Sequence, residues 1–132
     1  MLGETNLSIL LKSMKPILHD GEYVFCSVDY QNTSYLTFEP ICVFREDEGL
    51  TLVLPRECAD ANNISYFSVF RMITLSVHSS LDAVKFLATI TSRLVMHGIS
   101  VNPISAYYHD HLFIPASRAR EARALLQALS TE

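Results

Sequence analysis

The chain has 132 residues, of which 49% are hydrophobic and 18% are charged, and its formal net charge is −4. Surface-to-volume scaling leaves each half of such a chain marginally stable alone, so we expect small halves that interlock around shared structure. The excess of apolar residues predicts that some apolar surface is buried between subunits, as in a homo-oligomer. A negatively charged protein repels polyanions, and this argues against a nucleic-acid partner. Arg118, Arg120 and Arg123 cluster near the C-terminus, but Glu121 lies among them, and this pattern is typical of a solvated helix face.

The three cysteines, Cys26, Cys42 and Cys58, are odd in number and far apart, and no CxxC pair or zinc-ligand spacing occurs. We therefore expect buried, reduced thiols. No charged and then apolar leader opens the chain, and its apolar stretches are interrupted well short of the ~20 residues that a membrane span needs. These features predict a cytoplasmic protein without a membrane partner.

The first part of the chain is predicted to contain a short helix and a strand. Apolar residues recur at helical intervals over Leu7–Met14 and stop before Pro16, which disfavours helical geometry in the residue before it. Gly21–Val28 (GEYVFCSV) is rich in β-branched and aromatic residues, which indicates a strand. The polar segment Tyr30–Pro40 that follows is predicted to be a loop.

Residues 41–77 are predicted to form a hairpin, a short helix and a central strand. Two apolar runs flank Glu46–Gly49, where the glycine allows a tight turn. The acidic residues of this turn are expected to be solvated and are assigned no chemistry. Pro55 suits the start of a helix that ends at Asn62 and Asn63. The aromatic and β-branched residues of Tyr66–Val77 indicate a strand.

The segment that follows this strand contains the strongest candidate for a binding site. Ser79 and Asp82 approximate a capping box, which is also what an ordinary helix start looks like. Free amides at a helix start directly after a strand form a natural site for a carboxylate or a phosphate. The helix is expected to span Leu81–His97, with Gly98 after its end. Its predicted apolar stripe consists of Leu81, Val84, Leu87, Ala88, Leu94 and Val95.

The remaining residues predict a hairpin and a final helix. Pro103 lies in the first arm of the hairpin over 99–116, which places that arm at a sheet edge or a bulge. An amphipathic helix follows over residues 120–129. The order strand, helix, strand, strand, helix is a ferredoxin-like unit that lacks its last strand. Gly21–Val28 is the expected donor of that strand.

Four phrases, GEYVFCSV, EDEGLTLVLP, ITLSVHSSLDAV and YYHDHLFIP, resemble those of small bacterial ACT-domain proteins. This largely uncharacterised family is related to the regulatory domains of aspartate kinases. The resemblance implies an α+β, ferredoxin-like fold of the ACT type (βαββαβ). Two incomplete ACT-like halves, residues 1–68 and 69–132, would complete each other's antiparallel sheets.

The same resemblance implies a non-catalytic regulatory or sensor module that binds a small molecule, an amino acid, without a cofactor. ACT domains hold such a ligand at a domain or subunit interface, using the loop after the first strand and the start of the second strand. The amides of Ser80 to Asp82 would take the ligand carboxylate, and Asn102 or Asp82 would take its ammonium group. The implied ligand-binding residues are His78, Ser79, Ser80, Leu81 and Asp82 on one side, and Ile99, Ser100, Val101 and Asn102 on the other.

Two alternatives use the same part of the chain. A metal-binding protein or an enzyme could use the hairpin Tyr107–His111, in which His109 and His111 would point to one side of a strand and Asp110 to the other. A hydrolytic triad of Ser79 or Ser80 with His78 and Asp82 is disfavoured, because neighbours in sequence rarely align a nucleophile, base and acid.

A third alternative is a purely structural module that dimerises through its edge strand. It would bind no small molecule, so stabilisation by a ligand would distinguish it from a sensor.

Overall fold

The computed structural model describes residues 3–132 except 79, 81, 82 and 84. The chain is divided into two compact units. We call the first the split unit, because it consists of Met1–Asp20 together with Arg71–Glu132. The second, the inserted unit, is Gly21–Phe70. The N-terminal segment therefore belongs with the C-terminal part of the chain.

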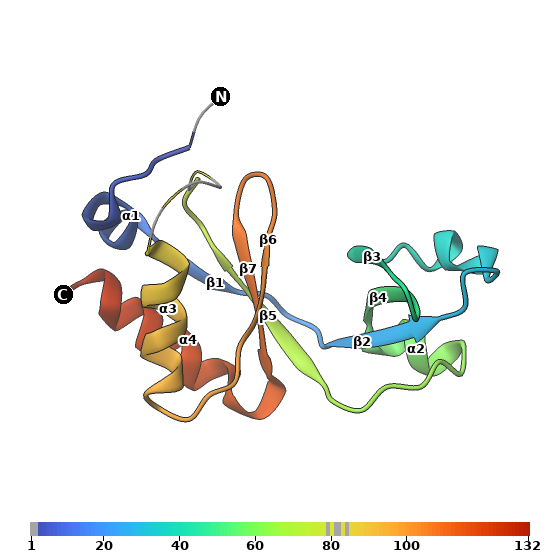
Figure 1. Ribbon diagram of the computed structural model, residues 1–132. Coiled ribbons are helices and arrows are strands. Elements are labelled where there is room, and N and C mark those ends of the chain that lie inside the picture. Colours follow the sequence, from blue (N-terminus) through green and yellow to red (C-terminus); the bar gives the residue numbers. More distant parts are fainter. Residues whose placement is uncertain (1–2, 79, 81–82, 84) are drawn as a thin grey trace. The chain divides into compact units, whose positions relative to one another are not determined.

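The split unit contains an antiparallel sheet in the order β1-β5-β7-β6 (Figure 1). Ile17 pairs with Thr74 between β1 and β5, and Ile104 pairs with His111 between β6 and β7. Within the described residues β1 and β6 are the two edges of this sheet. Its strands are β1 (Pro16–Leu18), β5 (Phe70–Leu75), β6 (Asn102–Ser105) and β7 (Asp110–Pro115).

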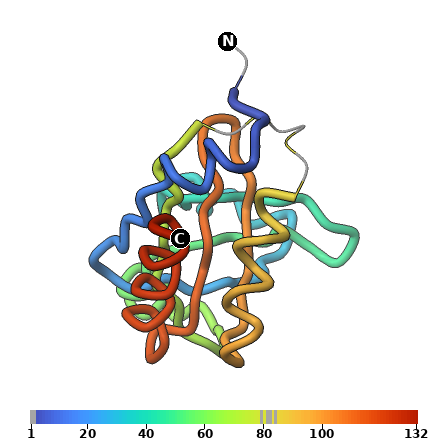
Figure 2. Tube along the Cα trace, turned by 90° about the vertical axis from the view of Figure 1, so that its left-hand side faces the viewer, coloured from blue at the N-terminus to red at the C-terminus, as the bar shows by residue number. Residues whose placement is uncertain are grey.

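Three helices lie on the same side of this sheet, as the views in Figures 1 and 2 agree. The first begins after Asn6, whose side chain accepts a hydrogen bond of 3.1 Å from the Ile9 amide. The last buries Ala122, Leu126 and Leu129 at helical spacing against the core. The helical segments are α1 (Leu7–Ser13), α3 (Phe86–Val95), the 3-10 turn η2 (Ala116–Arg118) and α4 (Ala119–Ser130).

Helix α3 begins later than the sequence predicted. Its first residue is Phe86, and Lys85 before it has a left-handed backbone with φ 73°. A left-handed residue cannot continue a right-handed helix, so Lys85 marks the boundary. The predicted capping residues Ser79 and Asp82 lie outside the described residues.

The face that α3 presents to the core also differs from the predicted stripe. Val95 is 64% exposed, although the stripe placed it inward, and Ala88 is exposed as well. Leu87 packs at the margin of the core. Residues that recur every four positions, close to the 3.6 residues of one turn, lie on one face of a helix. The buried residues are Phe86, Ile90 and Leu94.

The inserted unit is a three-stranded antiparallel arrangement in the order β3-β4-β2. The predicted hairpin and the short helix after Pro55 are confirmed. A 3-10 helix occupies part of the segment predicted as a loop. The core of the inserted unit consists of Val24, Cys26, Leu52, Leu54 and Ala59. The elements are β2 (Tyr23–Val28), η1 (Thr33–Phe38), β3 (Cys42–Glu46), β4 (Gly49–Pro55) and α2 (Arg56–Ala61).

The predicted ferredoxin-like fold of the ACT type is confirmed, but the expected strand donor is wrong. β1 supplies the fourth strand of the split unit by pairing with β5. β2, within the predicted donor Gly21–Val28, instead pairs along its whole length with β4 and meets β5 at the pair Tyr23–Phe70. β1 has three residues and begins with a proline, so it is too short to show the alternation of apolar and polar residues that marks a strand. The sequence pattern therefore could not reveal it. Within the described residues, no helix is both long and apolar enough to cross a membrane.

Candidate functional site

The first half of the predicted ligand site follows β5, and the N-terminal segment is bound to it. The Glu4 amide donates to the His78 carbonyl at 3.0 Å, and the Ser80 amide donates to the Glu4 carbonyl at 2.9 Å. The Ser80 amide is therefore already engaged, and is not the free donor that a carboxylate site at this point requires. Ser79, Leu81 and Asp82 lie outside the described residues.

An aromatic cluster forms where this loop meets the tip of the β6–β7 hairpin. The His78 ring centroid lies 5.4 Å from that of Tyr108 and 6.3 Å from that of Tyr107. The two tyrosine rings are 5.0 Å apart in an edge-on arrangement. Both tyrosines are more than half exposed, at 59% for Tyr107 and 56% for Tyr108. The predicted ligand loop and the predicted alternative site therefore share one end of the split unit.

The second half of the predicted site lies at the other end of the split unit. Residues 99–102 connect the end of α3 to the start of β6, whereas His78 lies beside the hairpin tip that follows β6 (Figure 1). The 10 residues of α3 alone span roughly 15 Å. Of the residues that the structure describes, His78 and the segment 99–102 are thus not brought together within one copy of the chain.

The residues of this second half differ in exposure. Ile99 is 1% exposed and belongs to the core, and its amide donates to the Leu94 carbonyl at 3.1 Å. Val101 packs against the same core. Ser100 and Asn102 are exposed and available to a ligand. Of the four predicted residues, these two are the ones that a ligand could reach with a side chain.

His111, in the alternative metal site, is engaged by Thr74. His111 Nδ1 lies 2.9 Å from Thr74 Oγ1, which lies 2.7 Å from His19 Nε2. Because Ile73 and Leu75 belong to the helix-covered core, Thr74 between them points to the opposite face of the sheet. The pKa of His111 is lowered, mainly by burial and further by the neighbouring histidines His109 and His19, against the opposing effect of Asp110.

The described residues supply no third ligand for a metal at this hairpin. The ring centroids of His109 and His111 are 6.3 Å apart, and Asp110 accepts a hydrogen bond of 2.5 Å from the Ser105 hydroxyl. No group of three or more His, Cys, Asp or Glu side chains in this part of the chain is arranged to hold a metal ion. The alternative serine triad needs Ser79 or Ser80 with Asp82, so its acid lies outside the described residues.

Comparison with known proteins identifies the family. Two family models, both of the ACT domain, match residues 2–71 and residues 68–128. The chain belongs to the ACT-domain family. ACT domains are generally regulatory modules that bind small molecules and oligomerise, and they are not themselves catalysts.

Solved structures share this ACT fold over nearly the whole chain. A Vibrio cholerae protein of unknown function, described as a possible transport protein, is 45% identical, with a TM-score of 0.86 over 94% of this chain and 95% of its own. A protein from Agrobacterium tumefaciens is 15% identical, with a TM-score of 0.68 over 89% of each chain. The ligand-free regulatory subunit of aspartate kinase from Thermus thermophilus is 8% identical, with a TM-score of 0.61 over 86% of this chain and 95% of its own. No protein with a curated description matches the chain.

Proposed function

We propose that this ACT protein is a non-catalytic sensor that binds an amino acid between two copies of the chain and regulates a separate protein. Membership of a family of regulatory, ligand-binding modules supports this proposal. The predicted ligand residues include the exposed Ser100 and Asn102 at one end of the split unit and the half-buried His78 at the other, on loops that a rigid sheet positions.

One observation carries the proposal: the two predicted segments lie at opposite ends of an edge strand. β6 is an edge within the described residues, and three of its four residues are exposed. Antiparallel pairing of β6 with β6 of a second copy would place the start of one strand beside the end of the other. Residues 99–102 of one copy would then lie near the His78 loop of its partner. A homodimer of this kind would bring together described residues of the predicted site that lie apart in one copy.

The side chains at this joined site suit an amino acid. The Asn102 amide can donate to a carboxylate or accept from an ammonium group, and His78 can donate to a carboxylate. The exposed rings of Tyr107 and Tyr108 offer an apolar surface for the ligand side chain. Asp82 remains the proposed partner of the ammonium group.

The proposal extends to the organisation and location of the protein. We propose that residues 1–68 and 69–132 are the two ACT-like halves, in support of which the two family matches meet at residues 68–71. The crossing of β1 into the sheet of the second half is consistent with interlocked halves. The free cysteines support a reducing, cytoplasmic location.

The test is a thermal-shift screen of the purified chain against the twenty amino acids, followed by light scattering to measure its mass. A ligand that binds the native state at about a hundred times its Kd stabilises that state by about 2.7 kcal/mol. We expect one amino acid to raise the midpoint and to favour the dimer. Asn102→Ala should abolish the shift, whereas Gln31→Ala, a change at an exposed residue of the inserted unit, should retain it.

Three outcomes would contradict the proposal. A dimer that responds to no amino acid would indicate the structural module instead. A shift with zinc or nickel that requires both His109 and His111 would indicate the metal-binding alternative. If an amino acid still raises the thermal midpoint of the Asn102→Ala variant, its binding site is not at the start of β6.

A further inference from the structure

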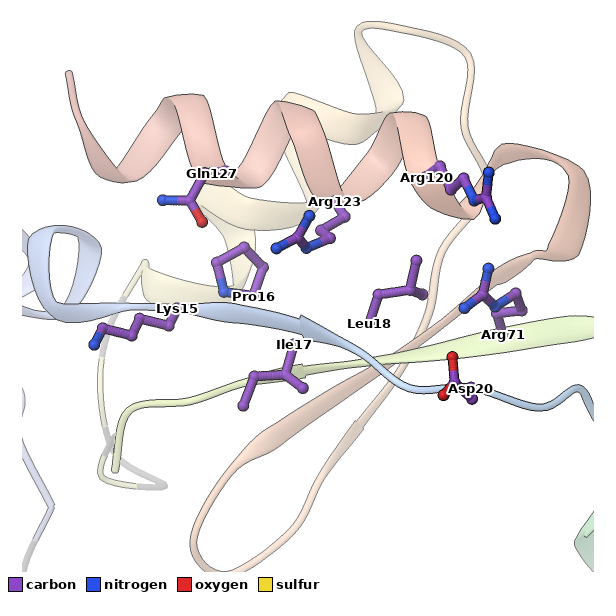
Figure 3. A pocket seen from close by; sticks show the side chains of 9 residues that line it. All are labelled: Lys15, Pro16, Ile17, Leu18, Asp20, Arg71, Arg120, Arg123 and Gln127. Carbon is purple, nitrogen blue, oxygen red and sulfur yellow. The ribbon is translucent and has the colours of Figure 1, made fainter.

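A groove of about 690 Å³ lies between β1 and α4 in the split unit (Figure 3). Its volume falls in the range of roughly 300–1,000 Å³ that is typical of small-molecule pockets. β1 and β6 are opposite edges of the sheet, so the groove is separate from the proposed amino-acid site. It is lined by Lys15, Pro16, Ile17, Leu18, Asp20, Arg71, Arg120, Arg123 and Gln127.

The charge of the groove is opposite to that of the protein. Four of its lining residues are cationic and one is a carboxylate, which gives a local balance of +3 (4 − 1), whereas the whole chain has a net charge of −4. Figure 3 shows the Arg123 side chain between α4 and β1, with Arg120 and Arg71 at one end of the groove and Lys15 at the other. The cations therefore line the length of the groove.

Three of the four cations have no carboxylate partner among the described residues. Within the described part of the chain, Lys15, Arg120 and Arg123 form no ion pair with a carboxylate. Arg118, by contrast, pairs with Glu121 at 2.8 Å and also donates to the His97 carbonyl at 3.0 Å. The predicted solvated arginine face is thus divided, because one arginine is used within the fold and the other two face the groove.

One of the cations is held by a backbone carbonyl, and two others are placed by their spacing on α4. The Arg71 guanidinium donates from Nη2 to the His19 carbonyl at 3.0 Å, which leaves its other N–H groups for a ligand. Arg120 and Arg123 are three residues apart on α4, so they project from one face of the helix. A guanidinium presents a planar fork of donors that matches carboxylate and phosphate oxygens.

The floor of the groove is apolar. Pro16 is buried, Leu18 is half-buried, and Ile17 is 45% exposed. A ligand there could pack a carbon framework or a ring on Leu18, whose side chain points toward α4 in Figure 3, while its anionic groups meet the cations. A simple inorganic ion would leave this apolar surface uncovered.

We propose that the groove between β1 and α4 binds a small organic polyanion, a metabolite with two or more phosphate or carboxylate groups on an apolar body. The groove would make this ACT protein responsive to a second ligand, independent of the amino acid. Lys15 belongs to the N-terminal part of the split unit and Arg71 to the part that follows the inserted unit, so such a ligand would also tie these two parts together.

The test is calorimetric titration of the full chain with ATP without magnesium, with pyrophosphate and with citrate, at about 150 mM salt, where weak surface attraction is screened. Adenosine and acetate are the probes that lack multiple negative charges. We expect saturable binding of at least one polyanion and none of adenosine or acetate. Pyrophosphate and citrate show whether phosphate or carboxylate is preferred, and tighter binding of ATP than of pyrophosphate would show that the apolar floor contributes.

Single substitutions locate the site. Arg120→Gln and Arg123→Gln should each weaken binding about tenfold, the size expected for loss of a charge-assisted contact. Lys12→Gln removes the same charge from an exposed residue of α1 outside the groove, and should change the affinity by less than about twofold because its effect is screened. Arg120 and Arg123 are exposed, so circular dichroism should show unchanged folding.

Two results would overturn the proposal. One is the absence of binding of all three polyanions at millimolar concentrations. The other is an equal loss of affinity in Lys12→Gln, which would indicate nonspecific attraction. Asn102→Ala should leave polyanion binding unchanged, so this proposal and the amino-acid proposal can fail separately.

Discussion

Thr74 and His111, 37 residues apart in sequence, are joined by a hydrogen bond of 2.9 Å between Oγ1 and Nδ1. The same hydroxyl lies 2.7 Å from His19 Nε2. A hydroxyl has one proton to donate and can accept from other donors, so it can connect two imidazoles of suitable tautomers. The three side chains thus link β7 and β5 to the residue directly after β1, on the face of the sheet away from the helices.

Thr74→Val should destabilise the split unit by about 1–2 kcal/mol, because it leaves two partly buried imidazole nitrogens without this partner. Thr74→Ser is the matched control, since it retains the hydroxyl. Urea unfolding at pH 8 measures the difference. A valine variant more stable than the serine variant would contradict the linking role.

Acid should destabilise the protein through His111. Its pKa is lowered in the folded state, so below the ordinary value of about 6.5 the unfolded chain binds more protons than the folded chain. The contribution of His111 to stability is therefore present above that pH and is lost as pH falls through about 6.5 toward the lowered folded pKa. Thermal midpoints between pH 8 and pH 5 measure this fall.

The His111→Gln variant should show a flatter pH dependence than the parent protein. His97→Gln removes a histidine at an exposed position and should leave the slope near that of the parent. If the slope of His111→Gln matches that of the parent, another group is responsible for the acid sensitivity.

Substitutions in α3 test which face of the helix packs on the core. Ile90 is fully buried, so Ile90→Ala should cost about 2–5 kcal/mol in unfolding free energy. Val95 is 64% exposed, so Val95→Ala should change stability by less than about 0.5 kcal/mol. Denaturant titration of both variants gives the comparison. Equal losses of unfolding free energy in the two variants would support the buried face that the sequence pattern predicted.

The turn between β3 and β4 requires a glycine for two reasons. Gly49 has φ 152°, and a Cβ there would lie 2.8 Å from the Val28 carbonyl oxygen. Gly98 also has a positive φ, of 69°, but a Cβ there would contact nothing within 4 Å. Gly49→Ala should therefore destabilise its unit by more than the roughly 1–3 kcal/mol typical of backbone strain alone, and Gly98→Ala should not exceed that range. Calorimetric unfolding of the two variants measures their losses of stability. A loss at Gly49→Ala equal to or smaller than that at Gly98→Ala would show that the turn relaxes to admit the Cβ.

The sequence pattern was most informative where structure depends on neighbouring residues. The helix at the N-terminus, the strand around Val24 and the two hairpins were predicted because each presents its own periodicity or turn residues. The pattern failed at α3 in two respects. The left-handed Lys85 places the start of the helix at Phe86, and the buried residues are Phe86, Ile90 and Leu94 rather than the predicted stripe. Nothing in the local sequence marks Lys85 as a left-handed residue, since glycine or asparagine is usual there.

The candidate site shows the same division. His78, Ser100 and Asn102 were proposed from a resemblance, and the structure places them at two ends of an edge strand. The contact of His78 with Tyr107 and Tyr108 could not be predicted, because it depends on where the hairpin tip lies relative to the loop after β5. The binding of Glu4 to that loop, which engages the Ser80 amide, was equally hidden.

By itself, the sequence determined the ferredoxin-like class, the order of most elements and the ACT family, because these follow from local periodicity and from motifs that are continuous in the chain. The tertiary structure alone decided that β1 is the strand that completes the second half. It also decided that Lys15, Arg71, Arg120 and Arg123 line one groove. Such groupings bring together residues far apart in the chain. They depend on which segments pair and pack, and a local sequence pattern does not contain this information.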